Sequence, residues 1–368
     1  MNNPIRILHV VTYMGRGGLE SMLMNYYRHI DRDRVQFDFL THRSFRADFD
    51  DEIESLGGKI YHLPKLVPWN PSYRNALNHF FTEHKEYKIV HVHQDCLSSV
   101  ILKCAARHHV PVRVAHSHNS NQDKNLKYIV KLYYRKQIPK YATALFACSQ
   151  EAGNWMFHGT PFWVMNNAID AKQYQFDSQH AQQVRRALNI SDHSLVVGHV
   201  GRFSTQKNHT FLLKVFSEIH KIIPDSKLLL VGDGSLRTQI ERQAKLLNID
   251  KQVIFTGIRS DVSELMQAMD VFVFPSLYEG LPVTLVEAQA AGLSCFISDK
   301  VPSECKITDL VTQIPLDVPT AQWAKIILEN RTSNRKDTYA QIAAAGYDIV
   351  EDAKWLQKFY LEQWKANE

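Results

Sequence analysis

Short, continuously apolar runs alternate with amphipathic stretches along almost the whole chain. Such runs are typical of parallel strands, because helices cover both faces of a parallel sheet. Repeated strand–helix units join through right-handed crossovers, so the sequence predicts α/β domains with doubly wound sheets. The predicted strands cover residues 6–11, 37–41, 59–63, 89–93, 113–116, 144–148, 163–165, 195–200, 227–231, 253–256, 271–274 and 295–297.

The strand rhythm breaks once, near residues 166–172, and restarts after a polar stretch. We therefore expect two Rossmann-like domains, residues 1–168 and 169–348, with a hinge between them. The length of 368 residues agrees with two domains. The tail, residues 349–368, reads as a helix rich in aromatic side chains. These need a partner surface, and we expect the first domain to supply it.

Cysteine usage and the apolar runs indicate where the protein works. The five cysteines have no Cys-x-x-Cys spacing, and their odd number argues against a disulfide framework. We expect buried, reduced thiols and a cytoplasmic location. No leader peptide is expected, since the first apolar run contains His9 and stops at a glycine-rich turn. No apolar window reaches the 18 residues of a membrane span.

The charge is small overall but unevenly distributed. The net charge of +5 is too modest to indicate a nucleic-acid partner, and we expect none. Residues 1–168 carry 21 basic and 14 acidic side chains, whereas residues 169–368 carry 22 and 24. The first domain is therefore the basic one.

One segment of the first domain, residues 124–140, concentrates this charge on a predicted helix without an acidic residue. Four of its cations recur every three or four residues, which places them on one helical face. Such a helix can lie peripherally on the anionic inner face of the plasma membrane. It can equally be a solvated helix that packs on its own domain through its aromatics. Its cations are Lys124, Lys127, Lys131, Arg135, Lys136 and Lys140.

An anion-binding pattern opens the second domain. Gly201 and Arg202 directly follow the predicted strand 195–200, and Lys207 precedes a helix with Asn208 at its N-cap. A strand end, a glycine turn, two cations and a helix N-terminus together favour an anion site. Two surface cations on an ordinary loop remain the alternative.

A second pattern follows the strand at residues 271–274. Glu279 lies in the turn after this strand, Pro282 is expected at the first helical position, and Glu287 lies inside the helix. Carboxylates accept two hydroxyl hydrogen bonds, which suits a polyhydroxyl ligand. The alternative is a helix with one N-terminal acid and one solvated acid. Turns at Asp233 and at residues 257–258 follow further strands and end at the same sheet edge.

Two motifs could indicate a metal, and we interpret neither as a metal site. The pairs His91/His93 and His116/His118 place each histidine with its partner on one strand face. No cysteine or third ligand shares a local pattern with them, so they are interpreted as site or core histidines. Asp-x-Asp occurs at residues 31–33 and 48–50 in polar stretches, where chance explains so short a motif. We expect no metal and no cofactor.

These motifs together resemble the retaining glycosyltransferases of family 4 over essentially the whole chain. The most specific element is the pair Glu279 and Glu287, with seven residues between them and Gly-Leu-Pro after the first. The overall pattern is similar to that of bacterial exopolysaccharide and capsule glycosyltransferases. The other matching segments are residues 17–20, 91–93, 115–119, 166–170, 201–207 and 231–234.

The resemblance implies the GT-B fold, with two Rossmann-like domains facing across a cleft, and transfer of a sugar from a nucleotide-sugar with retention of configuration. A UDP-hexose or UDP-N-acetylhexosamine is the expected donor, and a glycan, expected to be lipid-linked, is the acceptor. It implies that Arg202 and Lys207 hold the diphosphate, that Glu287 binds the ribose and that Glu279 lies at the donor sugar.

A histidine at a first-domain strand end contacts the sugar in such enzymes. His116 is favoured over His118 because it falls at the predicted strand end. The expected catalytic set is His116, Arg202, Lys207 and Glu279. The expected donor-binding set is Gly17, Gly18, His118, Gly201, Asp233, Gly257, Ile258, Gly280, Leu281, Pro282, Val283 and Glu287.

Three alternatives remain open at this stage. A nucleotide-sugar epimerase would use the same fold. An NADP-dependent oxidoreductase is hinted at by the glycines of residues 15–20, but the fingerprint ends in Glu20, where close packing wants Gly or Ala. The second predicted strand also lacks a ribose-binding acid at its end. The third alternative is a non-catalytic subunit that binds sugar nucleotides.

Overall fold

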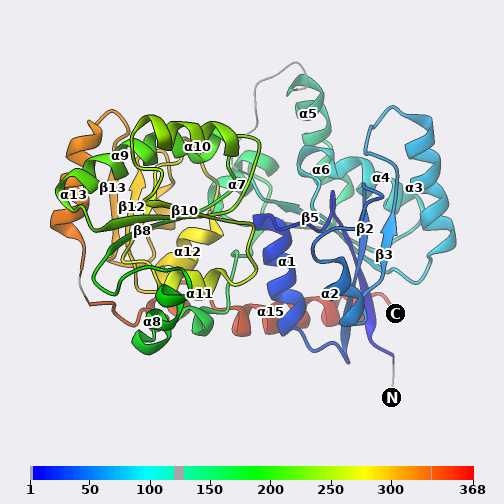
Figure 1. Cartoon of the computed structure of the whole chain (residues 1–368). Coiled ribbons are helices and arrows are strands. Elements are labelled where there is room, and N and C mark those ends of the chain that lie inside the picture. Colours follow the sequence, from blue (N-terminus) through cyan, green and yellow to red (C-terminus); the bar gives the residue numbers. More distant parts are fainter. Residues whose placement is uncertain (1–2, 120–127, 333) are drawn as a thin grey trace. The chain divides into compact units, whose positions relative to one another are not determined.

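The computed structural model describes residues 3–119, 128–332 and 334–368 (Figure 1). The chain divides into two compact units. Unit 1 comprises residues 1–168 and 349–368, and unit 2 comprises residues 169–348. Each unit is built on its own parallel sheet, with helices on the connections. The predicted pair of Rossmann-like sheets is therefore confirmed.

Unit 1 contains a seven-stranded parallel sheet in the order β3-β2-β1-β4-β5-β6-β7. Its central strands are buried, as their continuous apolar runs predict. The order reverses between β1 and β4, so the loops after these two strands diverge toward opposite faces. The strands are β1 (Ile5–Val10), β2 (Val35–Thr41), β3 (Ile60–His62), β4 (Ile89–Val92), β5 (Val112–Ser117), β6 (Ala144–Ala147) and β7 (Trp163–Val164).

Two helices of unit 1, α3 and α7, begin at capping side chains. Asn70 accepts a hydrogen bond from the Ser72 amide at the start of α3, and Ser149 does the same for Ala152 in α7. The described helices are α1 (Gly18–His29), α2 (Asp50–Ser55), α3 (Pro71–Glu83), η1 (Asp95–Leu97), α4 (Ser98–Arg107), α5 (Tyr128–Arg135), α6 (Ile138–Tyr141) and α7 (Gln150–Phe157).

The long basic helix predicted over residues 124–140 is wrong in its described part. Helix α5 ends at Arg135, and the separate short helix α6 begins at Ile138. Pro139, in the first turn of α6, has no amide proton to continue the α5 ladder. Lys124 and Lys127 lie outside the described residues.

The tail forms helix α15 (Ile349–Lys365) and belongs to unit 1, as predicted. It contacts α1, and its Tyr360 side chain is fully buried among the sheet residues. The Tyr360 hydroxyl lies 2.6 Å from Nδ1 of His91 on β4. Phe359 packs against Phe146 of β6, with 5.0 Å between the ring centroids. The tail thus completes the core of the first unit.

Unit 2 contains a six-stranded parallel sheet in the order β10-β9-β8-β11-β12-β13. The reversal point lies between β8 and β11. Strand β13 was not predicted, because Val-Thr-Gln-Ile at the sheet edge is only half apolar. The strands are β8 (Leu195–Val200), β9 (Ser226–Val231), β10 (Val253–Gly257), β11 (Val271–Phe274), β12 (Ser294–Ser298) and β13 (Val311–Ile314).

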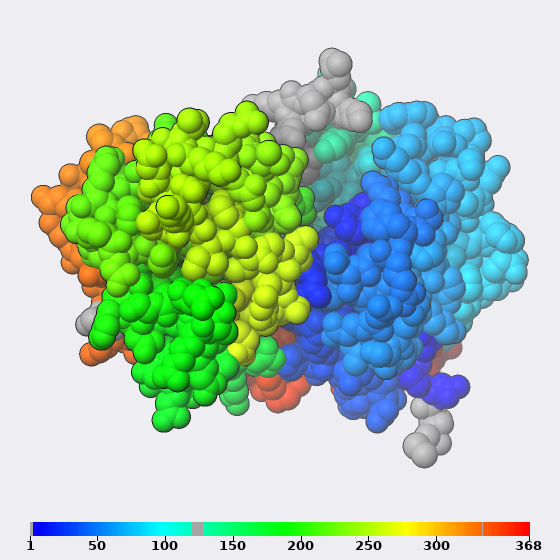
Figure 2. All heavy atoms as spheres, viewed as in Figure 1, coloured from blue at the N-terminus to red at the C-terminus, as the bar shows by residue number. Residues whose placement is uncertain are grey.

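The helices of unit 2 follow the predicted strand–helix alternation. In the space-filling view, side chains from the green and yellow-green segment that includes α8, α9 and α10 form its surface (Figure 2). The described helices are η2 (Ala171–Tyr174), α8 (Ser178–Ala187), η3 (Thr205–Lys207), α9 (His209–Ile222), α10 (Arg237–Leu246), α11 (Val262–Gln267), α12 (Val283–Ala290), η4 (Ser303–Cys305), α13 (Thr320–Asn330) and α14 (Tyr339–Ala344).

Two further expectations concern burial and the membrane. All five cysteines are buried, which agrees with their interpretation as core residues. Among the described residues, the helices are too short or too polar to cross a bilayer.

The contact between α15 and β4 is expected to stabilise unit 1. Tyr360→Phe keeps the buried ring but removes the hydroxyl that meets His91, so the free energy of unfolding should fall by about 1–2 kcal/mol. Hydrogen exchange followed by mass spectrometry can measure this for unit 1 alone. Tyr133→Phe, at an exposed ring, is the control and should change nothing. Equal protection in wild type and Tyr360→Phe would contradict this role.

Candidate functional site

The loops after β8 and β11 meet at the point where the strand order of unit 2 reverses. Ligands of open α/β sheets bind outside the carboxyl ends of the strands at such a point. The Leu277 amide donates to the Gln206 carbonyl at 2.8 Å, and the Gln206 side-chain amide donates to the Tyr278 carbonyl at 3.0 Å. These reciprocal bonds hold the two loops together as one structure.

A buried ion pair joins the same two loops. Lys207 Nζ lies 2.7 Å from Glu279 Oε1, and the two side chains are 15% and 6% exposed. Lys207 Nζ also lies 4.5 Å from the centre of the Phe274 ring, at the end of β11. Moving the two side chains apart would leave each charge buried without a partner, which costs free energy. The ion pair therefore keeps its geometry. The structure therefore fixes the Glu279 carboxylate beside the loop after β8.

Arg202 and Asn208 flank this ion pair. The Arg202 side chain is exposed, and no described acidic side chain forms an ion pair with it. Asn208 precedes α9 as predicted, but its side chain does not cap the helix. Its backbone is left-handed, with φ of 54°, and its Nδ2 donates to the Pro275 carbonyl at 3.1 Å. The predicted cap is thus a third link between the loops.

The loop after β9 packs closely against the loop after β8 because Gly232 has no side chain. A Cβ atom at Gly232 would lie 2.3 Å from the Gly201 carbonyl oxygen, and the φ of +128° also favours glycine. The next residue, Asp233, accepts from the Phe203 amide through its carbonyl at 2.9 Å. The Gly232 amide in turn donates to the Gly257 carbonyl at 2.8 Å. Ile258, directly after Gly257, is exposed.

Helix α12 presents the second carboxylate of the pattern. Burial raises the pKa of Glu287 to about 7, and a hydrogen bond from Tyr174 opposes this rise. Glu287 therefore changes charge near neutral pH. Pro282 is the N-cap of α12, one residue outside its predicted position in the first turn. Leu281 and Val283 are core residues of unit 2, so only their backbones can face a ligand.

In unit 1 the predicted glycines lie at the start of α1. Gly17 is the N-cap, and Gly18 is the first helical residue. A Cβ atom at Gly17 would lie 2.2 Å from Oε2 of Glu20. The Glu20 carboxylate thus folds back over the turn where a dinucleotide fingerprint would have to receive a diphosphate. Such a negative charge disfavours the oxidoreductase alternative.

The two competing histidines of β5 differ in exposure. The strand ends at Ser117, one residue later than predicted. His116 is 2% exposed, whereas His118, the first residue beyond the strand, is partly exposed. Nε2 of His118 lies 2.9 Å from Nδ1 of His93. His118 is therefore better placed than His116 to reach a ligand.

Several contacts of the candidate site were not visible in the sequence. Tyr174 reaches Glu287 across 113 positions of the chain, and Gln206 reads as an ordinary loop residue. The aspartates of the two Asp-x-Asp segments form hydrogen bonds within their own turns. Asp31 accepts from the Asp33 amide at 3.1 Å, and Asp50 accepts from the Ala47 amide at 2.9 Å.

The predicted residues of each unit lie after or at the carboxyl ends of parallel strands. In unit 2 they follow four neighbouring strands, β8 to β11, at their carboxyl ends. In unit 1, Gly17 and Gly18 follow β1, and His116 and His118 lie at the end of β5.

Comparisons with known proteins cover both parts of the chain. Residues 16–173 match the sequence profile described as Glycosyltransferase Family 4, and residues 181–339 match that of Glycosyl transferases group 1. The putative glycosyltransferase EpsF of Bacillus subtilis is 38% identical and covers 96% of both chains. The capsular polysaccharide biosynthesis glycosyltransferase CapH of Staphylococcus aureus is 22% identical over 98% of this chain and 99% of its own.

Two further matches name ligands of the proteins concerned. The Escherichia coli UDP-Gal:alpha-D-GlcNAc-diphosphoundecaprenol alpha-1,3-galactosyltransferase is 31% identical over 39% of this chain and 38% of its own. The crystal structure of Anabaena Alr3699/HepE in complex with UDP and glucose superposes with a TM-score of 0.80. It covers 97% of this chain and 99% of its own, at 18% identity. The chain belongs to the retaining family 4 glycosyltransferases, which have the GT-B fold.

Proposed function

We propose that this glycosyltransferase moves a hexose or N-acetylhexosamine from a UDP-sugar to a lipid-linked glycan during cell-surface polysaccharide synthesis. The observation that carries the proposal is the buried Lys207–Glu279 pair at the reversal point of unit 2, with Arg202 in the loop after β8 and Glu287 on α12. This arrangement joins cations for a diphosphate to carboxylates for hydroxyl groups.

Arg202 and Lys207 are the proposed diphosphate ligands. Negative charge grows on the diphosphate as the glycosidic bond breaks, and cations already in position stabilise that charge. Arg202 offers two parallel N–H donors, whereas Lys207 acts as a point charge held in place by Glu279. The amides at the start of α12 add the positive end of a helix dipole.

Two carboxylates are assigned to hydroxyl groups of the donor. Glu287, once ionised, accepts hydrogen bonds from both ribose hydroxyls. Glu279, with the Gly280 and Leu281 backbone, is assigned to the sugar. We do not assign Glu279 as a nucleophile, because its carboxylate is engaged with Lys207. Retention then follows from attack on the face that the diphosphate leaves.

The relatives support the identity of donor and acceptor. HepE binds UDP and glucose, and the E. coli relative takes UDP-Gal and a diphosphoundecaprenol-linked acceptor. CapH acts in capsular polysaccharide biosynthesis. A nucleotide-sugar panel scored by binding and by slow hydrolysis tests the donor without any acceptor. Product analysis separates transfer from epimerisation of the sugar nucleotide.

The surface of α5 supports an anionic, lipid-linked acceptor. Ile129 and Tyr133 are 78% and 63% exposed, so the outer face of α5 is apolar rather than packed on its own unit. Apolar side chains next to cations favour the interface of an anionic bilayer. This surface, from α5 through Lys140, is the proposed peripheral membrane contact.

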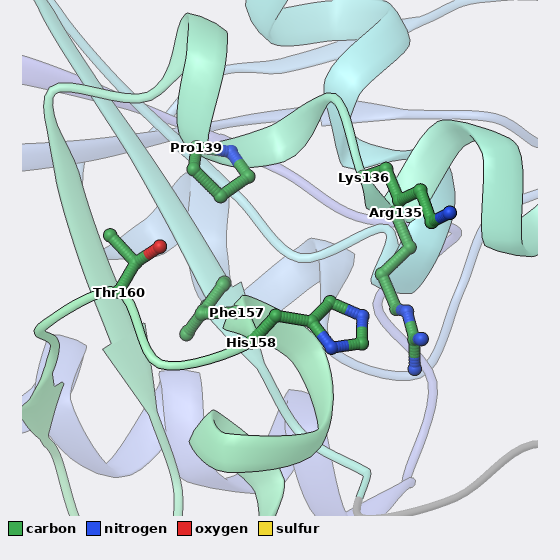
Figure 3. Close-up of a pocket in the computed structure, with 6 residues that line it drawn as sticks. All are labelled: Arg135, Lys136, Pro139, Phe157, His158 and Thr160. Atoms are coloured by element: carbon green, nitrogen blue, oxygen red, sulfur yellow. The ribbon is translucent and has the colours of Figure 1, made fainter.

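A basic pocket of about 330 Å³ lies beside this surface (Figure 3). The Arg135 and His158 side chains point toward one another there, and Lys136 adds a second charge. Arg135 is buried, stacks on Trp155 with 4.7 Å to the ring centre, and its Nε has no partner among the described residues. A buried guanidinium N–H without a partner favours an anion such as a lipid phosphate.

The diphosphate assignment predicts a loss of turnover. The double variant Arg202→Ala/Lys207→Ala should lower kcat at least about 100-fold, because both cations act on charge that develops in the transition state. Steady-state transfer kinetics measure this effect. Lys221→Ala removes an exposed cation at the far end of α9 and serves as the control. Wild-type turnover in the double variant would falsify the assignment.

The raised pKa of Glu287 predicts a pH-dependent donor affinity. Only the ionised carboxylate accepts both ribose hydroxyls, so a pKa of about 7 should make binding about tenfold tighter at pH 8 than at pH 6. Calorimetry should use the intact UDP-sugar, whose diphosphate diester does not titrate in this range. Glu287→Gln should bind weakly at both pH values, and the same pH dependence in this variant would exclude Glu287 as the cause.

The α5 surface predicts binding to anionic vesicles at low salt. Wild type should sediment with phosphatidylglycerol vesicles more than with phosphatidylcholine vesicles. The variants Ile129→Ser/Tyr133→Ser and Lys136→Glu should reduce both this binding and transfer to a lipid-linked acceptor. They should leave transfer to a soluble acceptor analogue intact. Lys85→Glu, at an exposed position elsewhere in unit 1, is the charge control, and equal loss in this control would refute a dedicated surface.

A further inference from the structure

Five histidines gather inside unit 1 at the carboxyl ends of its three central strands. His9 lies on β1 and pairs in register with His91 on β4, and His116 lies on β5. His93 and His118 directly follow β4 and β5. The His91 and His93 rings stack with 4.4 Å between their centroids, and the His116 and His118 rings are tilted with 4.1 Å between theirs.

The cluster contains a set of three with the geometry of a metal site. The ligand nitrogens of His93, His116 and His118 all lie within 4.8 Å of one another. Nδ1 of His93 and Nε2 of His118 are 2.9 Å apart. Tetrahedral zinc with bonds of about 2.1 Å separates its ligand nitrogens by about 3.4 Å, so small ring movements suffice.

His116 supplies the independent observation. Its ring is 2% exposed, and neither of its nitrogens has a hydrogen-bond partner in the described part of the chain. Buried polar groups are normally paired, so an imidazole with two unsatisfied nitrogens needs an explanation. A cation that takes one nitrogen lone pair supplies the missing interaction.

We propose that His93, His116 and His118 bind one first-row divalent cation, with zinc as the expected ion. Three histidines leave one tetrahedral position for water. His118 is partly exposed and provides the route of entry. The effect of the ion is to fix the His118 ring through Nε2, which leaves the proton on Nδ1.

A second set of three, His9, His91 and His93, is the internal competitor. All three are buried. Nδ1 of His91 is engaged with the Tyr360 hydroxyl at 2.6 Å, whereas Nε2 of His9 and Nε2 of His91 have no partner among the described residues. Each set contains one pair of ring nitrogens within hydrogen-bond distance, so this contact does not separate the two sets. This set lacks a route of entry through a partly exposed member, so we assign the ion to the other set.

Titration of the tag-free, EDTA-treated protein tests the proposal without any transfer assay. Zinc followed by calorimetry should bind with a stoichiometry of one, and cobalt should give the visible absorption of a tetrahedral site. His116→Gln and His118→Gln should each weaken zinc binding at least tenfold. His79→Gln, at an exposed position on α3, should bind as wild type does.

Three results would overturn the proposal. The first is a wild-type protein that binds no zinc and gives no cobalt spectrum, in which case the cluster is a hydrogen-bonded chain only. The second is binding that is unchanged in His116→Gln and His118→Gln. The third is binding lost in His9→Gln but kept in His116→Gln, which moves the ion to the other set. The wild-type titration decides the first point even where a variant folds poorly, and circular dichroism identifies such a variant.

Discussion

Burial of both sheet faces is the constraint from which the rest of the structure follows. Helices cover each parallel sheet, so the carboxyl edges are where strand-end side chains can gather around a ligand. At the reversal point the neighbouring loops leave toward opposite faces, and a space opens between them. Unit 2 places its cations after β8 and its carboxylates after β11, on the two sides of that point. The strand order alone therefore determines where in unit 2 the candidate site lies.

The Lys207–Glu279 pair turns this location into a defined geometry. An exposed ion pair would do little to fix the two loops, but the Lys207 and Glu279 side chains are almost fully shielded from water. Three hydrogen bonds between the same loops support the pair. Each cation therefore does a different task. Lys207 is immobilised by its partner, whereas exposed Arg202 is available to adjust to a ligand. In the proposed diphosphate site, one charge is therefore held in place and the other is free to move.

The sequence predicted most of this arrangement, and its failures have physical reasons. Twelve of the thirteen strands follow from continuous apolar runs, whereas β13 is half polar because it lies at the sheet edge. The prediction of one helix through residues 124–140 was wrong because it relied on the spacing of the charges and did not allow for the helix break near Pro139. The residues around Glu279 were identified because they are close in sequence. Tyr174 and His9 were missed because their partners lie 113 and 84 positions away.

Burial shifts pKa values in opposite directions in the two units, because it favours the neutral form of both acids and bases. It raises the pKa of Glu287 and lowers that of the histidines in unit 1. In the proposed function, Glu287 loses its proton when a polyhydroxyl ligand binds, because a carboxylate is a stronger hydrogen-bond acceptor than a carboxyl group. In unit 1 the same effect opposes protonation of histidines that lie side by side, where neighbouring positive charges would repel one another.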